Sequence, residues 1–230
     1  MKRIASTIVG ALALIPLSSP AFAALRSPQV VVNGGTLQAY LNGIGESISV
    51  PTDQQDAQRW STTVSNNSSL TIMIELGADA ATTAAGLYNA GAAVPPLYVV
   101  FPGAASTGWF AIASFRTAPS RVIVNLFDNT ATLFSTTTHL GADGHDFGFY
   151  VQGPGGLFFS QDARNAGGTA QALTYLGTGA NAGNWWLAWE ARNSSTGGDY
   201  DYDDCVLFLE SMNPTPVSQT TWGAVKARYR

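Results

Sequence analysis

The sequence contains one cysteine, Cys205, and two histidines, His139 and His145, among 230 residues. A single cysteine cannot form a disulfide within the chain. Zinc sites use several histidine or cysteine ligands, so this chain supplies too few of them for a typical zinc centre. Cys205 begins the apolar run Cys205–Leu209, and neither histidine is close to it in sequence. We therefore expect a buried core thiol rather than a nucleophile.

Charged residues are also scarce, since Asp, Glu, Lys and Arg make up 11% of the chain and the net charge is −4. Binding to the phosphates of a nucleic acid needs a basic surface, which excludes nucleic acid as the main partner. Beyond the N-terminus, no apolar run is long enough for a transmembrane helix. The partner stays open, with a polysaccharide or a surface protein as the two candidates.

The first 23 residues have the three parts of a bacterial export signal. Lys2 and Arg3 give a positive start, Ile4–Leu17 is a short apolar core, and Ala21-Phe22-Ala23 is a cleavage site. The alternative is a buried N-terminal helix, which the cleavage site disfavours. Cleavage before Ala24 leaves nine basic residues against 15 acidic ones, a net charge of −6. We expect a secreted protein, extracellular or at the cell surface.

Alternation of apolar and polar residues dominates the rest of the chain, and helical periodicity is nearly absent. Short apolar segments are separated by Gly, Asn, Asp and Pro. The strand candidates are Gln29–Asn33, Leu70–Leu76, Leu97–Phe101, Trp109–Arg116, Val122–Leu126, Thr132–Thr136, Phe147–Gln152, Leu157–Ser160, Ala172–Leu176, Trp185–Glu190 and Cys205–Leu209. This pattern predicts an all-β fold, a single-domain β-sandwich over residues 24–212, with the jelly roll as one form of it.

The C-terminal end has a different character. Met212–Gln219 contains two prolines and predicts an extended linker, so residues 213–230 form a linker and a short basic tail. In a helix, Trp222, Val225 and Tyr229 would form a stripe opposite the basic residues. Two readings remain open, a frayed tail and a docking or sorting segment.

The most informative motif is acidic: Asp199, Asp201, Asp203 and Asp204 fall within six residues. Four unpaired carboxylates repel one another, and a divalent cation removes that cost. Calcium takes several oxygen ligands from such loops, and alternate aspartates can turn toward one ion. The alternative is a solvated acidic loop that binds nothing. Because two apolar strands flank the loop, we favour a calcium site.

Glu190 is a further candidate ligand, because it ends the apolar run Trp185–Trp189 shortly before the acidic loop. If the two flanking strands pair as a hairpin, Glu190 meets the aspartates. The loop is not an EF-hand: Asp204 stands where that motif requires glycine, and the following run is strand-like. Glu210 is therefore expected at the far end of a strand, away from the ion.

The motifs from Phe147 to Glu210 resemble the domain of unknown function 4114 family (DUF4114), found in exported bacterial proteins that often carry a PEP-CTERM sorting tail. That family has an FGFYL segment, a GG-FYS-D-LN segment, an aliphatic strand ending in Phe-Glu-Asp, and D-x-DYND before an apolar strand. The matching segments here are Phe147-Gly148-Phe149-Tyr150-Val151, Gly155–Asn165, Leu187–Ala191 and Asp199–Val206. Upstream, Leu70–Leu76, Gly86–Asn89 and Val100–Ala104 also fit, in order. The resemblance implies a secreted β-sandwich with calcium sites and no assigned enzymatic activity.

The chain departs from the family pattern at three places. Ala191 replaces the acidic residue after Glu190, which removes one ligand, whereas Asp203 replaces the usual Asn and adds a charge. No transmembrane helix follows Pro216, so a PEP-CTERM membrane-anchored intermediate is not supported.

Alternative functions depend on other residues. A carbohydrate-binding module would use Trp109, Trp185, Trp186 and Trp189 for stacking if they form an exposed row. A glycoside hydrolase would need paired carboxylates in a deep pocket, and no such pair stands out. No Gly-x-Ser-x-Gly motif is present. His145 with Asp143 and Asp146 could form a second metal site, although a polar turn explains them better. We expect a non-enzymatic protein.

Overall fold

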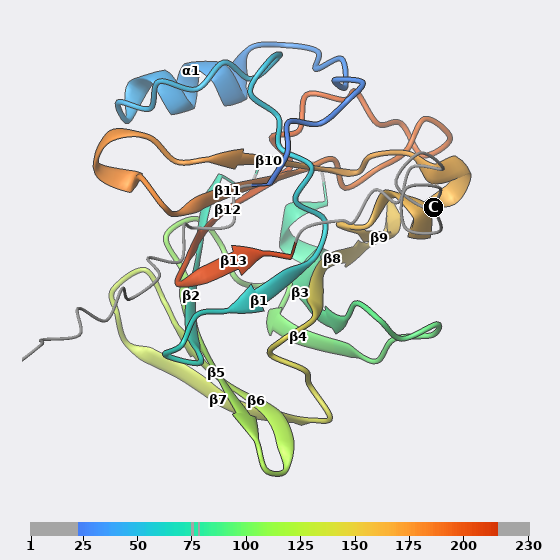
Figure 1. The fold of residues 1–230 in the computed structure, drawn as a ribbon. Coiled ribbons are helices and arrows are strands. Elements are labelled where there is room, and N and C mark those ends of the chain that lie inside the picture. The colour runs from blue at the N-terminus through green and yellow to red at the C-terminus, as the bar shows by residue number, and fades with distance from the viewer. Residues whose placement is uncertain (1–22, 75, 78, 216–230) are drawn as a thin grey trace, which may run out of the picture.

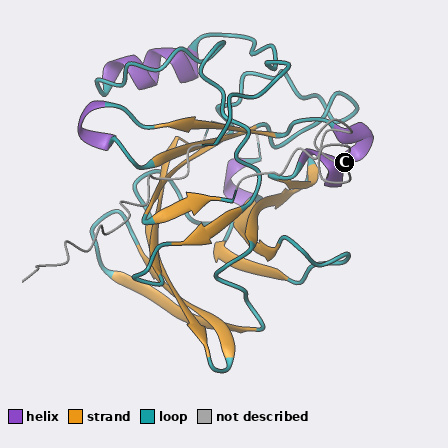
Figure 2. Cartoon of the chain, in the orientation of Figure 1, coloured by secondary structure: helices purple, strands orange, loops and turns teal. Residues whose placement is uncertain are grey.

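We analysed a computed structural model of the whole chain, which describes residues 23–74, 76–77 and 79–215. The expected export signal, apart from Ala23, and the basic tail lie outside the described residues. Figure 2 shows a fold built mostly from strands and loops, with few helices. Among the described residues, no helix has the length and apolar character needed to cross a membrane.

The strands form two antiparallel sheets that pack as one sandwich-like domain (Figure 1), which confirms the predicted all-β sandwich. One sheet has the order β13-β1-β8-β3-β4, with β9 paired to β8, and the other has the order β10-β11-β12-β2-β5-β6-β7. The strands are β1 (Trp60–Thr62), β2 (Asn67–Ile74), β3 (Ala84–Asn89), β4 (Leu97–Phe101), β5 (Phe110–Thr117), β6 (Ser120–Phe127), β7 (Leu133–Leu140), β8 (Phe147–Gly153), β9 (Gly156–Phe159), β10 (Ala172–Leu176), β11 (Trp185–Trp189), β12 (Cys205–Glu210) and β13 (Met212–Pro214). The helices are α1 (Thr36–Gly43) and the short 3₁₀ turns η1 (Ala80–Thr82), η2 (Asp162–Arg164), η3 (Ala166–Gly168) and η4 (Gly179–Asn181).

The main core lies between the two sheets. Val122, Val124 and Leu126 of β6 point inward, and intervening residues such as Asn125 are only partly buried. This period of two is what an antiparallel sheet with one covered face requires. The opposite sheet contributes Phe149 and other residues of β8 to the same cluster.

A second, smaller core covers the outer face of β10, β11 and β12. Leu37 and Leu41 of α1 pack there against Trp186 and Tyr202, and Figure 1 shows α1 lying across these strands. All five side chains of β11 are buried, because the strand is covered on both faces. The apolar runs at Trp185 and Cys205 therefore form inner strands, as the sequence predicts.

Three sequence predictions need correction. Gln29–Asn33 is not a strand: the Gln54 side chain accepts from the Val30 N–H and donates to its carbonyl, so one amide replaces a partner strand. The helix α1 was not predicted, because Leu37 and Leu41 are its only buried residues and give too short a pattern. Met212–Pro214, expected in the linker, forms β13 against β1, so the folded domain extends beyond residue 212.

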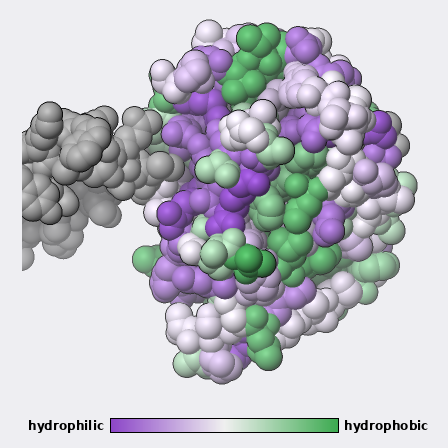
Figure 3. Space-filling model, turned by 90° about the vertical axis from the view of Figure 1, so that its right-hand side faces the viewer, coloured by the Kyte–Doolittle hydropathy of each residue, from purple (hydrophilic) through white to green (hydrophobic). Residues whose placement is uncertain are grey.

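The face drawn in Figure 3 is hydrophilic over much of its area, with a patch of apolar side chains near its middle. On the strand β7, Leu133, Phe134 and Leu140 are 53%, 59% and 71% exposed. These three residues share one edge of the seven-stranded sheet.

Candidate metal centre

The hairpin of β11 and β12 brings Glu190 to the acidic loop, as the sequence predicts. The two strands pair from Trp185↔Leu209 to Trp189↔Cys205, so the chain leaves and re-enters the sheet at one end. The Tyr200 N–H donates to Oε2 of Glu190 at 2.6 Å. Glu210 lies at the other end of β12, paired with Ser69 of β2, as expected. Cys205 is buried, which confirms its predicted place in the core.

The loop backbone alternates so that tyrosines and aspartates take different directions. Tyr200 and Tyr202 have φ angles of 61° and 58°, in the left-handed region that residues with a side chain rarely adopt. Tyr202 is fully buried, and its hydroxyl donates to the Ala170 carbonyl at 2.9 Å. Packing of this ring on the second core offsets the backbone strain. Tyr202 thereby anchors the loop on the second core, whereas Asp199 is exposed and Asp201 is half-buried.

Three carboxylates meet above this anchor. Glu190, Asp199 and Asp201 each offer an oxygen, and these oxygens all lie within 4.8 Å of one another. Glu190 is 1% exposed, Asp201 is half-buried and Asp199 is exposed. The Oε1 atom of Glu190 is buried and has no hydrogen-bond partner in the described part of the chain. A buried carboxylate oxygen without a partner is costly, and a cation at this point would satisfy it.

The pKa values of three carboxyls in and beside the loop are raised. Burial, followed by the negative charge of Asp204, raises the pKa of Glu190 to about 8. Burial and the nearby Asp201 raise the pKa of Asp203 to about 6. Burial also raises the pKa of Asp204, although the hydrogen bond from the Ala191 N–H acts to lower it. The carboxyls compete for protons, and a metal ion would take the place of those protons.

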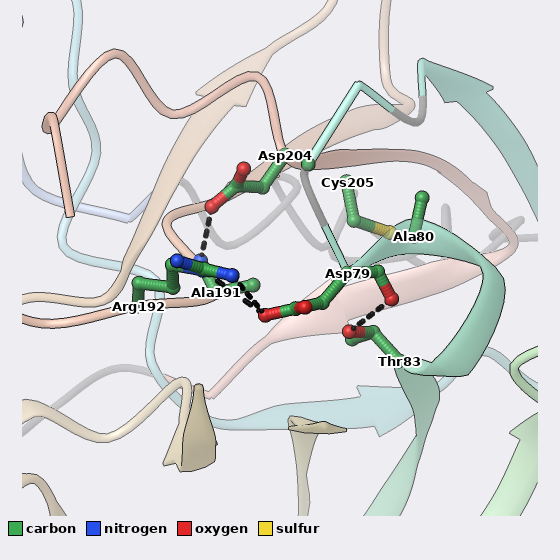
Figure 4. Close-up of a pocket in the computed structure, with 8 residues that line it drawn as sticks. Asp79, Ala80, Thr83, Ala191, Arg192, Asp204 and Cys205 are labelled. Carbon is green, nitrogen blue, oxygen red and sulfur yellow. Dashed lines mark hydrogen bonds and ion pairs between the residues drawn. The ribbon is translucent and has the colours of Figure 1, made fainter. Parts of the chain in front are cut away.

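Asp203 and Asp204, the other two predicted ligands, have different neighbours. Oδ2 of Asp204 accepts the Ala191 N–H at 2.7 Å, beside a small cavity that also contains the Arg192–Asp79 ion pair (Figure 4). Asp203 is buried and interacts with the Thr36 side chain at the start of α1. The structure therefore groups Glu190, Asp199 and Asp201 around one point. Asp204 hydrogen-bonds the Glu190 carboxyl beside them, and Asp203 contacts α1.

Sequence reasoning missed Asn33, which supports the loop from the opposite end of the chain. Its Nδ2 donates to the Asp199 carbonyl at 2.6 Å, and its N–H donates to the Tyr200 carbonyl at 2.8 Å. Gly34 follows with a φ of 68°, and a Cβ there would lie 3.5 Å from Cβ of Asp201. No sequence motif links residues that are 166 positions apart, so only the fold reveals this support.

His145, Asp143 and Asp146, considered as a second metal site, do not converge on one point. Asp146 pairs with Arg59, whose Nε lies 2.8 Å from its Oδ1, and Oδ1 of Asp143 accepts the His145 N–H. These are the contacts of a polar turn between strands. The other histidine, His139, has its Nε2 2.9 Å from the Val99 carbonyl.

The tryptophans do not form an exposed row. Trp185, Trp186 and Trp189 are at most 3% exposed, so their rings are part of the two cores. Trp109 is half-buried, with its ring centroid 4.9 Å from that of Phe134. Sugar stacking on the three tryptophans of β11 would require the core to open.

Comparisons with protein-family models, with curated proteins and with solved structures found no match to this chain. The resemblance to DUF4114 therefore depends on the sequence motifs alone. What the structure adds is a cluster of Glu190, Asp199 and Asp201 that could hold a metal ion.

Proposed function

We propose that this chain is a secreted, non-enzymatic β-sandwich protein that binds one calcium ion at Glu190, Asp199 and Asp201. The observation that carries the proposal is the buried, unpartnered Oε1 of Glu190 beside two further carboxylates. All three side chains offer oxygen, the ligand that calcium prefers, and none offers the nitrogen or sulfur of typical zinc sites. Water and backbone carbonyls would complete the six to eight oxygens that calcium takes.

The role of the ion is structural in this proposal. Glu190 directly follows β11, and the aspartates belong to the loop that leads back into β12. A calcium ion between them would cancel the repulsion of the carboxylates and fix the loop against the sheet. The ion would thus stabilise the pairing of two core strands, and the calcium sites implied by the DUF4114 resemblance agree with this role.

A calcium site of this kind suits a protein that is exported to the cell surface. The predicted signal over residues 1–23 would deliver the chain to a medium in which calcium is abundant. Extracellular modules bind calcium with dissociation constants of about 10⁻⁴–10⁻³ M. We propose that the protein is a component of the cell surface or the extracellular matrix, and that the ion keeps it folded there.

A calcium titration of the purified mature protein tests the proposal. An ion that binds the folded state alone stabilises it by about 2.7 kcal/mol at a hundredfold excess over the dissociation constant. We expect the melting temperature to fall in chelator and to recover with calcium, with magnesium less effective because it demands a tighter octahedron. Equal melting temperatures in excess chelator and in millimolar calcium would contradict the proposal.

A matched pair of variants locates the site. Asp201→Asn removes one charge from the cluster and should weaken the calcium response. Asp53→Asn removes one charge from a turn where Asp53 accepts the Ser49 N–H, outside the cluster, and should leave the response unchanged. Elemental analysis of the two proteins and the unaltered chain then gives the metal content directly.

A further inference from the structure

The strand β7 is an open edge of the seven-stranded sheet. It pairs with β6 from Arg121↔Leu140 to Phe127↔Leu133, and within the described part of the chain no strand pairs with its other edge. β7 is eight residues long, and most of its side chains are exposed. An edge of this length offers a row of free N–H and C=O groups to another strand.

β7 has few of the usual protections of an edge strand, and the one present is a bulge at Phe134 near its start. Its sequence, Leu-Phe-Ser-Thr-Thr-Thr-His-Leu, has no lysine, no acidic residue and no proline. The edges of the other sheet are shorter: β4 has five residues, β9 has four and β13 has three. β7 is thus the longest edge strand that the structure describes.

We propose that β7 pairs antiparallel with β7 of a second copy of this chain, with Thr137 facing Thr137 across a two-fold axis. Such an axis is perpendicular to the sheet and keeps each face of the strand on the same side, so residues of equal parity meet. The register then places Phe134 opposite Leu140, Ser135 opposite His139 and Thr136 opposite Thr138. The exposed apolar residues at the two ends of β7 cover one another, and threonines meet in the middle.

The side-chain pattern of β7 selects this register. Centring the axis on Thr136 instead would leave Leu140 opposite Thr132, outside the strand. Aromatic and β-branched cross-strand pairs stabilise a sheet, whereas like charges directly opposite destabilise it. β7 carries no charged residue, so two copies approach without repulsion despite the net negative charge of the chain.

The other end of the same sheet explains why assembly stops at two copies. β10 is the opposite edge strand, and Gln55 bridges to its Thr174, with the Gln55 N–H donating to the Thr174 carbonyl at 2.8 Å. Arg26 also donates to the Ala172 carbonyl of this strand. With β10 covered, each chain presents one long open edge in this sheet, and a two-fold pairing closes the assembly.

Sedimentation of the mature protein tests the pairing. We expect a dimer for the unaltered chain. Thr137→Lys, which places two like charges face to face, should give a monomer with an unchanged circular dichroism spectrum. Thr52→Lys makes the same change on an exposed turn near α1 and should remain dimeric. A monomeric unaltered chain, or a dimer that Thr137→Lys does not weaken, would overturn the proposal.

Disulfide trapping tests the register. Directly opposite residues of an antiparallel pair have Cα atoms about 4.5–5.5 Å apart, which suits a disulfide. Thr137→Cys should therefore form a covalent dimer under mild oxidation. Thr136→Cys should not form one, because residue 136 faces residue 138 of the second copy. The Cα atoms of the two residues 136 would then be roughly 8 Å apart, too far for a disulfide. Linkage at 136 and not at 137 would overturn the register, and the unaltered chain, whose Cys205 is buried, is the control.

Discussion

Glu46 accepts a hydrogen bond from the indole Nε1 of Trp186 at 3.0 Å, 140 residues later in the chain. Its carboxylate also accepts from Nδ2 of Asn181 and, at 2.6 Å, from both the N–H and the hydroxyl of Thr178. Glu46 is 5% exposed. One buried carboxylate therefore joins the segment after α1 to the η4 turn and to the core strand β11, and among the described residues it is held by hydrogen bonds without an ion pair.

We predict that Glu46→Gln destabilises the protein by about 1–3 kcal/mol at pH 7, because buried donors lose a charged acceptor. Burial alone would raise the pKa of Glu46, but the hydrogen bonds from Thr178, Asn181 and Trp186 outweigh it and lower the pKa below 4.5. A lowered pKa contributes stability above the unfolded value, and that stability is lost as the pH falls through the folded value.

Urea unfolding between pH 7 and pH 3 checks this prediction. The difference in unfolding free energy between the unaltered chain and Glu46→Gln should be constant at neutral pH and shrink below pH 4.5. Glu210→Gln, at the end of β12, is the control and should show no such loss. A difference that does not change with pH would mean that the charge of Glu46 contributes nothing.

The effect of Asp201→Asn on the stability of the protein should change sign when calcium is added. Without calcium, Asp201→Asn relieves repulsion on Glu190 and should stabilise the protein by about 0.5–1 kcal/mol, a fraction of the effect of one pKa unit. With calcium, the same variant loses a ligand and should be less stable than the unaltered chain. Thermal unfolding in chelator and in calcium measures both effects.

Asp203→Asn provides the comparison within the loop. Asp203 interacts with Thr36 and lies outside the three-residue cluster, although it is next to Asp201, so Asp203→Asn should reduce the calcium response less than Asp201→Asn does. An Asp203→Asn protein that loses its calcium response while Asp201→Asn retains it would show that the ion sits elsewhere in the loop.

The export prediction concerns the first residue of the mature chain. We expect N-terminal sequencing of secreted protein to begin at Ala24. A chain that begins there keeps the contacts of its first residues: the Ala24 carbonyl accepts the Asp56 N–H at 2.7 Å, and Arg26 pairs with Asp162 at 2.5 Å. Exported protein that still begins at Met1 would contradict the prediction.

How far the sequence predicts this molecule depends on the range of each interaction. The β11–β12 hairpin and its acidic loop are local, so apolar runs and an acidic cluster predict that Glu190 and Asp201 come together, as they do in the structure. Asn33, by contrast, joins the site through contacts with a loop 166 residues away, and no local pattern records them. The strand predicted at Gln29–Asn33 fails for a related reason, because Gln54 supplies hydrogen bonds that alternation cannot reveal.

The C-terminal boundary gives the last prediction. The strand β13 completes the six-stranded sheet: Met212 pairs with Thr62, Pro214 pairs with Trp60, and the Thr215 N–H donates to the Arg59 carbonyl at 2.7 Å. Met212 is 2% exposed and belongs to the main core. β1 otherwise meets its sheet at a single pair, Trp60 with Phe147, so β13 holds this edge in place.

We therefore expect two truncations to differ sharply. Removal of Thr220–Arg230 should leave the melting temperature nearly unchanged, because the last strand among the described residues, β13, ends at Pro214, before the deletion. Removal of everything after Ser211 should destabilise the protein by more than Met212→Ala alone, and that substitution should cost about 2–5 kcal/mol as a buried methionine is lost. Denaturant unfolding of the three proteins measures the effects. A large loss of stability on removal of Thr220–Arg230 would show that the tail packs on the domain. A Met212→Ala protein of unchanged stability would show that β13 contributes little to the fold.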